Sequence, residues 1–322
     1  MNKKQIQGVV NAYDLGKLIS YKPAAKGLVN DNNIVKTSND QYVVRKFFQN
    51  RNIPEVKSEL ELLDYLVKKK FPYQIPVPIR LPNGSRIFNN ECLVYKFIPG
   101  VNKRSFSESQ IKDLAKMIAT YHKLMTGFKP SYKKDWGNAF TTAWQKKEMS
   151  DHCPNATNRT FRGKLLLENK DMFHNLLNQI DKKYQNIKLP KYTIHNDLNR
   201  GNILFENGKI SGLIDFDNCH IDYIIKDITQ FLYRGIGKSD VIDFKNSKLF
   251  LDEYRKYKSI PRKEIAYIPD IAINSEIGAF MWMYDQFERN PKTKIKTKHI
   301  IESERQVKWF DKNRDKIIRM LS

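Results

Sequence analysis

Three polar residues near the middle of the chain have the types and spacing that a metal-assisted phosphoryl transfer requires. Asp197 and Asn202 lie five residues apart, and Asp215 follows Asn202 by thirteen. Apolar runs at 203–205 and 210–214 flank a turn at 206–208, which predicts a hairpin that returns Asp215 to the loop of the other two. One carboxylate could deprotonate an attacking hydroxyl, while the other carboxylate and the amide oxygen hold Mg²⁺ against nucleotide phosphates. We therefore predict Asp197 as the catalytic base and Asn202 and Asp215 as metal ligands.

The segment 194–217 also resembles a known pair of motifs. His-Asn-Asp-Leu, then Asn202, then Ile-Asp-Phe is similar to the pattern of the aminoglycoside phosphotransferase, choline kinase and homoserine kinase superfamily. The likeness is strongest to homoserine-kinase-like small-molecule phosphotransferases. The alternative is a plain β-hairpin with polar turns, since Asp and Asn are common turn residues. That alternative needs three polar residues to fall by accident at these spacings between apolar strands.

The resemblance covers residues 15–125 and 190–235 and implies a two-lobed, protein-kinase-like α+β fold. Such a fold has an N-terminal antiparallel sheet with one main helix, followed by a mostly helical C-terminal lobe. The chain has that pattern, with a β-rich part at 1–98, a break at Pro99-Gly100 and a helical part at 99–322. We expect strands at 33–37, 42–48, 85–88 and 91–97, helices at 3–19, 55–69, 107–125, 165–184, 224–232, 271–287 and 299–321, and loops over 126–162.

A cation on a strand and an acid on the following helix suggest a pair that grips nucleotide phosphates. Arg45 lies in the apolar strand 42–48, and Glu59 lies on the helix after it. In kinases a strand cation pairs with a helix carboxylate in this way, and Arg can bind phosphate bidentately. Lys46 is the alternative cation, although strand alternation should point it away. Glu61 is the alternative acid.

The resemblance implies further contacts to a nucleotide. Gly27 and Asn30 lie in a Gly-x-x-Asn loop before a strand, similar to the phosphate loop of homoserine-kinase-like proteins. Leu-Val-Tyr-Lys-Phe-Ile-Pro-Gly resembles the hinge segment between the lobes. There the adenine would bond to backbone groups of Lys96 and Ile98, with Tyr95 at the back of the pocket. ATP and Mg²⁺ are the cofactors implied.

Other polar residues near the motifs are expected to support the site. His195 should hold the catalytic loop rather than act as a base, and the resemblance gives His122 and Asp227 structural roles as well. Asp217 could bind metal through water or cap its turn, and we favour the turn. Asn199 stands where relatives often carry a basic residue, so its contact with phosphate stays open.

The composition argues against several other classes of protein. The net charge is +22, but the basic residues are spread over the whole chain, so a lysine-rich solvated surface is favoured over nucleic-acid binding. The three cysteines have no close pair, and neither a membrane span nor a secretory signal is apparent. We expect a cytoplasmic protein with free thiols and do not predict its oligomeric state.

These observations favour an ATP- and Mg²⁺-dependent phosphotransferase that acts on a hydroxyl of a small molecule. Homoserine or a related amino alcohol leads, and a sugar or an aminoglycoside is the alternative. Residues 126–170 and 271–290 supply no acidic cluster, which argues against a polycationic acceptor. A protein of another class would be a catalytically inactive kinase-like binding or coat protein. The intact set of Asp197, Asn202 and Asp215 argues against it.

Overall fold

The computed structural model describes residues 1–24, 30–47, 52–134, 136–239, 241–289 and 295–322. The chain divides into two compact units that alternate along the sequence. The first, here called the sheet unit, comprises residues 1–104, 127–134 and 201–219. The second, the helical unit, comprises residues 105–126, 135–200 and 220–322. Each is described by itself.

The sheet unit is built on an antiparallel sheet of four strands in sequential order. These are β1 (Leu18–Pro23), β2 (Asp31–Thr37), β3 (Gln41–Lys46) and β4 (Cys92–Lys96). Successive side chains of a strand point to opposite faces, so each face packs against its own helix. Helix α1 (Lys3–Ala12) buries Ile6 and Val10 with Val44 and Val94. Helix α2 (Ile53–Lys68) buries Val56 and Leu60 with the alternate residues Leu93 and Tyr95.

A hairpin also belongs to the sheet unit. Strands β6 (Ile203–Glu206) and β7 (Lys209–Leu213) pair across Asn207-Gly208, and both turn residues have positive φ. Asn-Gly is the sequence that favours this two-residue turn. Val101 exchanges backbone hydrogen bonds with Phe205, and Gln74 does so with the Ser211–Leu213 edge. The hairpin is therefore fixed on both edges.

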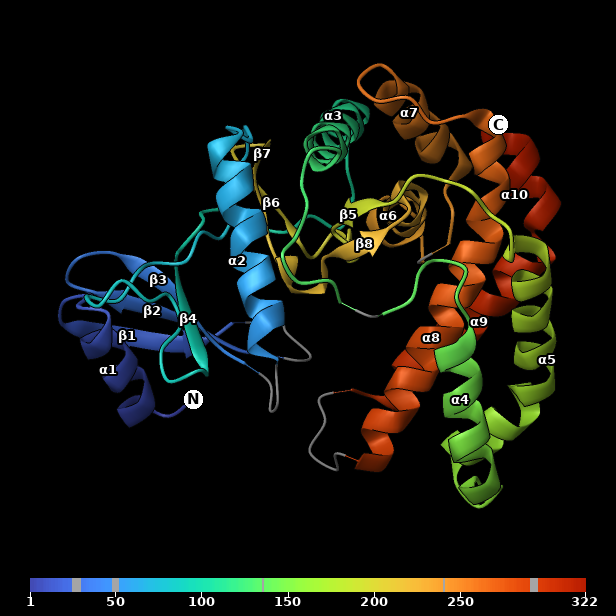
Figure 1. Cartoon of the computed structure of the whole chain (residues 1–322), viewed down its shortest axis with the longest axis horizontal. Helices are drawn as coiled ribbons and strands as arrows, with labels where there is room; N and C mark the ends of the chain where they lie inside the picture. Colours follow the sequence, from blue (N-terminus) through green and yellow to red (C-terminus); the bar gives the residue numbers. More distant parts are fainter. Residues whose placement is uncertain (25–29, 48–51, 135, 240, 290–294) are drawn as a thin grey trace. The chain divides into compact units, whose positions relative to one another are not determined.

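The helical unit consists mainly of α-helices. They are α3 (Glu108–Met125), α4 (Ala143–His152), α5 (Phe161–Tyr184), α6 (Ile224–Gln230), α7 (Phe244–Arg255), α8 (Ile268–Arg289), α9 (Thr297–Lys312) and α10 (Arg314–Leu321). Helix α8 lies among α4, α5 and α9 (Figure 1) and is buried along most of its length. Strands β5 (Tyr192–Ile194) and β8 (His220–Asp222) form a short antiparallel pair. Short turns are η1 (Cys153–Asn155), η2 (Phe216–Asn218), η3 (Phe231–Gly235) and η4 (Arg262–Tyr267).

The predicted fold class is confirmed, with local corrections. The helix expected at 3–19 ends at Ala12, and the strand β1, which was not expected, begins at Leu18. Helix α7 was not expected either. Residues 85–88 form no strand, and only Phe88 bridges to Cys92, because Asn89 and Asn90 turn the chain at once with positive φ. The stretch 126–162, expected as loops, contains α4. The single helix expected at 299–321 is broken at Asn313 into α9 and α10.

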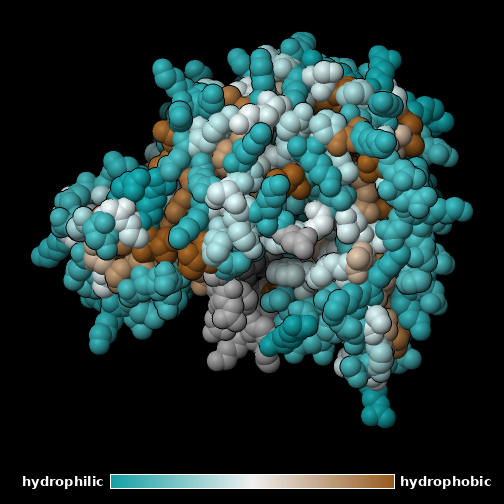
Figure 2. Space-filling model, viewed as in Figure 1, coloured by the Kyte–Doolittle hydropathy of each residue, from teal (hydrophilic) through white to brown (hydrophobic). Residues whose placement is uncertain are grey.

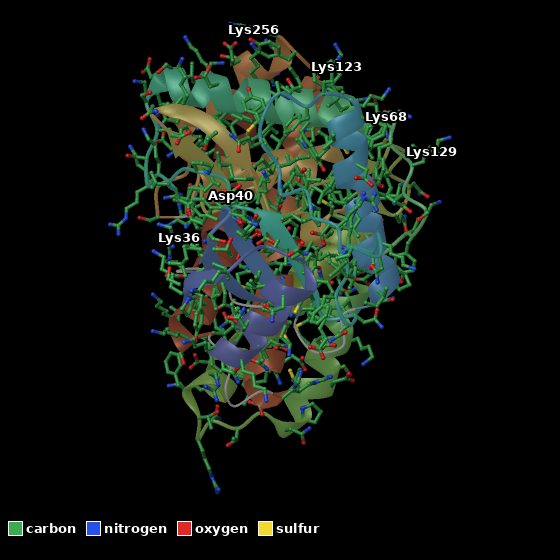
Figure 3. The ribbon with its side chains drawn as sticks, turned by 90° about the vertical axis from the view of Figure 1, so that its left-hand side faces the viewer. Lys36, Asp40, Lys68, Lys123, Lys129 and Lys256 are labelled. Carbon is green, nitrogen blue, oxygen red and sulfur yellow. The ribbon has the colours of Figure 1, made fainter. Side chains whose placement is uncertain are left out.

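Exposed lysine side chains contribute to the high net charge. Hydrophilic residues cover most of the face shown in Figure 2. Lys36, Lys68, Lys123, Lys129 and Lys256 come from different elements and all extend outwards (Figure 3). Among the described residues no helix has the length and apolar composition needed to cross a membrane.

Candidate active site

The hairpin brings the two predicted metal ligands together. The backbone N–H of Ile214, next to Asp215, donates to the carbonyl of Asn202 at 2.9 Å. The side-chain amide of Asn102 donates hydrogen bonds to the carbonyls of Gly201 (2.8 Å) and Ile203 (3.0 Å), which fixes the start of β6. Asn202 is buried, and a carboxylate beside an amide oxygen is a donor set that suits Mg²⁺.

Asp215 has a left-handed backbone, with φ 70° and ψ 64°. Few residues other than glycine adopt it, and Asn and Asp tolerate it best. The chain then enters the short turn η2, where the carboxylate of Asp217 accepts a hydrogen bond from the side chain of Asn30 at 2.7 Å. The carbonyl of Asp217 accepts one from Lys134. Asn30 thus contacts the segment that contains the predicted metal ligand Asp215, while Gly27 lies outside the described residues.

Arg45 and Glu59 form a buried ion pair in the sheet unit. Nη2 of Arg45 donates to Oε1 and Oε2 of Glu59 at 2.7 and 2.8 Å, and the two side chains are 6% and 1% exposed. Burial lowers the pKa of Arg45, but the charges of Glu59, Tyr95, Asp217 and Asp215 together raise the pKa above its ordinary value. The guanidinium therefore stays charged and interacts electrostatically with Asp215, one of the predicted metal ligands.

Lys46 and Glu61, the alternative cation and the alternative acid, have other partners. Lys46 contacts Glu91 at 3.0 Å, as strand alternation requires for a side chain on the opposite face. Glu61 accepts hydrogen bonds from the hydroxyl and the backbone N–H of Ser131, at 2.5 and 3.1 Å. Arg45 and Glu59 are therefore the candidates that the structure brings together.

The predicted hinge residues lie at the end of β4. Tyr95 is buried, and its ring centroid lies 5.4 Å from the guanidinium carbon of Arg45. The side chain of Lys96 is 74% exposed, so its part in a nucleotide site would be taken by its backbone. A Cβ at Gly212 would lie 3.0 Å from Cγ2 of Ile98, so β7 packs closely on this segment.

In the helical unit one carboxylate holds the start of the loop that contains the predicted base, Asp197. Asp227 is fully buried and accepts backbone hydrogen bonds from His195 and Asn196, both at 2.7 Å. It also bonds Nε2 of His122 at 3.0 Å, while Nδ1 of the same ring lies 2.8 Å from the hydroxyl of Tyr254. A carboxylate only accepts, so Nε2 carries the proton and Nδ1 accepts from Tyr254.

The pKa shifts agree with this arrangement. Burial lowers the pKa of His122, and the bond and charge of Asp227 offset part of that effect. Burial raises the pKa of Asp227, but the hydrogen bonds from the side chain of His122 and the backbone of His195 outweigh it, so this pKa is lowered. A neutral histidine and an ionised aspartate result.

Asp197 follows in the same loop. Asn199 donates its side-chain amide to Oδ1 of Asp197 at 2.8 Å and to its carbonyl at 3.1 Å. Leu198 between them is buried and anchors the loop. Asn199 therefore orients the predicted base. Asp197 belongs to the helical unit, whereas Asn202 and Asp215 belong to the sheet unit.

A charged pair near this loop was missed by sequence reasoning. Arg234 lies in η3, where the N–H of Ile236 bonds the carbonyl of Phe231 at 3.0 Å, five residues back, as in a π-helix. Nη2 of Arg234 lies 2.5 Å from Oε1 of Glu276 on α8, and that carboxylate is 1% exposed. An arginine within the otherwise apolar run 231–236 was the available signal.

A second cluster could hold a metal ion. Glu148, His152 and Asp285 offer ligand atoms that all lie within 4.8 Å of one another. His152 Nε2 lies 3.4 Å from Glu148 and 3.2 Å from Asp285. Arg289 already contacts the Asp285 oxygen at 2.6 Å, so one acid of the cluster has a cationic partner.

The chain as a whole is similar to known phosphotransferases. A model of the phosphotransferase enzyme family matches residues 20–259. The homoserine kinase of Gluconobacter oxydans (strain 621H) is 26% identical over 233 residues, 69% of this chain and 68% of that protein.

Solved structures share the fold over the whole chain. The amicoumacin kinase hAmiN, in complex with AMP-PNP, Ca²⁺ and Ami, has a TM-score of 0.71 at 15% identity and covers 100% of this chain and 98% of its own. The microcompartment-associated aminopropanol kinase has a TM-score of 0.69 at 17% identity, with 100% of both chains covered.

Proposed function

The chain belongs to the phosphotransferase enzyme family, and we propose that this small-molecule kinase uses ATP and Mg²⁺ to phosphorylate a hydroxyl group of homoserine or a related amino alcohol. The observation that carries the proposal is the backbone bond between Ile214 and Asn202, which holds the backbone of Asn202 next to the residue before Asp215. A kinase needs such a pair of oxygen ligands, and a hairpin that served structure alone does not.

The nucleotide side of the reaction is assigned to the sheet unit. Asn202 and Asp215 would hold Mg²⁺, which when bound neutralises phosphate charge as the γ-phosphoryl group leaves. Arg45 would bind phosphate oxygens, kept in place by Glu59, and the backbone near Lys96 would take the adenine. Solved kinases of this fold carry AMP-PNP or ADP, which supports nucleotide binding.

The acceptor side is assigned to the helical unit. Asp197 would accept the proton of the substrate hydroxyl and orient its oxygen towards the γ-phosphate. Asn199 fixes the direction of the carboxylate, and Asp227 fixes the backbone of the loop. His195, with its backbone bonded to Asp227, has a positioning role rather than that of a base.

The acceptor is proposed to carry at most one cationic group. The homoserine kinase of Gluconobacter oxydans supports homoserine, and the aminopropanol kinase fold supports amino alcohols in general. Two acids of α8 are already engaged, Glu276 with Arg234 and Asp285 with His152. A site for a polycationic aminoglycoside needs several available carboxylates.

The test is an ATP-consumption screen with Mg²⁺ over amino acids, amino alcohols, sugars and aminoglycosides. We expect acceptor-dependent ADP release with homoserine or an amino alcohol, and loss of that release in Asp197→Asn. The inactive alternative predicts nucleotide or ligand binding without turnover. ADP release that does not differ between the wild type and Asp197→Asn would contradict the assignment.

A further inference from the structure

Arg234 combines a guanidinium held by an ion pair with a partly exposed side chain. Its side chain is 31% exposed, although its partner Glu276 is almost fully buried. The hydroxyl of Tyr233 donates to the same oxygen of Glu276, at 2.7 Å. The buried carboxylate is therefore satisfied by two neighbours, and it holds one end of the guanidinium in place.

The pair with Glu276 leaves Arg234 able to bind a second anion. A guanidinium has five N–H donors, and the contact to Glu276 is made by Nη2. Its planar donor fork matches a carboxylate bidentately, and it is less strongly hydrated than an ammonium group. A guanidinium held by a buried acid has also already lost its rotamer freedom, which lowers the cost of binding a ligand.

The turn of Arg234 is joined to the loop of the predicted base. Arg200, three residues after Asp197, donates from Nε to the carbonyl of Arg234 (3.2 Å) and from Nη2 to that of Gly237 (2.8 Å). A Cβ at Gly237 would lie 2.2 Å from the carbonyl of Val241, so the chain is closely packed here. The position of Arg234 is thus tied to the catalytic loop.

Electrostatics link the two side chains. Burial lowers the pKa of Arg234, but Glu276, Tyr233 and Asp197 raise it above its ordinary value. Asp197 is therefore within the range of this cation. An anionic group entering near Asp197 would meet repulsion from that carboxylate, and Arg234 is a cation within range to offset it.

We propose that Arg234 binds a carboxylate of the acceptor, so that the substrate is a hydroxy acid such as homoserine rather than an amino alcohol that lacks the carboxylate. This inference rests on the proposed function, because it concerns the acceptor of the same reaction. Among the acceptors named above, it favours those that carry a carboxylate.

The test compares acceptors that differ only in this group. Homoserine is paired with 2-amino-1,4-butanediol, and 4-hydroxybutyrate with 1,4-butanediol. Binding is measured by calorimetry with AMP-PNP and Mg²⁺, and kcat/KM is measured by ADP release. The variants are Arg234→Gln, which keeps a donor for Glu276, and Arg234→Lys, which keeps the charge. Arg289→Gln, which removes a cation from an acid on the same helix, is the matched control.

We expect the wild type to favour the acid of each pair, and Arg234→Gln to weaken acid binding about 10- to 100-fold while leaving the alcohol unchanged. Arg234→Lys should recover part of the preference, and Arg289→Gln should keep all of it. Thermal unfolding checks that each variant is folded. Equal binding of acid and alcohol, or an equal loss for both in Arg234→Gln, would overturn the inference.

The two proposals fail in different ways. Preference for the acid in calorimetry, lost in Arg234→Gln but without ADP release, would support the carboxylate site and contradict the kinase reaction. Turnover of both members of a pair with equal kcat/KM, changed alike by Arg234→Gln, would support the kinase and contradict the carboxylate site.

Discussion

Replacing Asp227 by asparagine should detach the catalytic loop while leaving the fold in place. The carboxylate accepts two backbone hydrogen bonds from the loop at 2.7 Å and one from His122. An amide keeps one acceptor oxygen and turns an NH₂ group towards a former donor. At least one charge-assisted bond is lost, and such a bond contributes about 1.5–3 kcal/mol. If that energy holds the loop, kcat should fall about 10- to 100-fold.

Asp222→Asn is the matched control for this experiment. Asp222 is equally buried and accepts two backbone hydrogen bonds, from Ala139 at 2.9 Å and Tyr223 at 2.8 Å, but none of them belongs to the catalytic loop. Its pKa is about 2, because Lys226 and the hydrogen bond from His220 lower it against the opposing effect of burial. Both variants should lose stability in urea unfolding at pH 7, where both carboxylates are ionised. A fall in kcat beyond that of the control is expected only for Asp227→Asn.

Amide hydrogen exchange supplies the second measurement. The N–H groups of His195 and Asn196 should exchange faster in Asp227→Asn and at the wild-type rate in Asp222→Asn. If kcat of Asp227→Asn stayed within about twofold of the control, a bond of this strength would not be holding the loop. The positioning role of Asp227 would then be refuted, whatever the loss of stability.

Four further results are expected. Asp197→Asn should lower kcat by about 10²–10⁴-fold with nucleotide affinity nearly unchanged, whereas Asp215→Ala should abolish Mg²⁺-dependent nucleotide binding; normal turnover of Asp197→Asn would contradict the first assignment. Arg45→Ala should raise the KM for ATP and lower kcat, and Glu59→Ala should do so more weakly; a nucleotide-bound structure with Arg45 turned to solvent would end this idea. Because burial lowers the pKa of His122, the unfolded chain binds a proton on this histidine more readily than the folded protein does. The free energy of unfolding should therefore fall as pH decreases below about 6.5. In urea unfolding, His122→Asn should make this pH dependence weaker, and an unchanged pH dependence would exclude His122 as its source. Finally, kanamycin-like substrates should give a much lower kcat/KM than homoserine, and a high value for a tetracationic acceptor alone would show that local acids outweigh the net charge.

The sequence predicted the parts of the fold that follow regular periods. The apolar spacing in 55–69 predicted α2, and β-branched runs predicted β2 and β3. Helix α4 was missed because it has no apolar stripe: its buried residues include Gln145 and Glu148, and Gln145 bonds Asn274 at 2.9 Å. Burial of polar side chains through tertiary partners leaves no signal in hydrophobic periodicity.

The same limit applies to the candidate site. The contact between Arg45 and Glu59 could be expected from strand and helix spacing. The contact between Arg234 and Glu276 could not, because 42 residues separate them and the wide turn η3 decides which side chain faces α8. Neither residue type nor local spacing specifies a π turn, so Arg234 looks in the sequence like a chance charge in an apolar run.

The wide turn η3 suggests one way in which the preferred acceptor could differ among related chains. A π turn holds an extra residue relative to an α-helical turn. Deleting one residue from 231–233 would let α6 continue with ordinary bonds, and it would rotate the following side chains, Arg234 included, by about 100° around the helix axis. A residue other than Arg234 would then meet Glu276. Gain or loss of carboxylate recognition would be recorded as a gap of one codon in an alignment of relatives, and a search for substitutions alone would miss it.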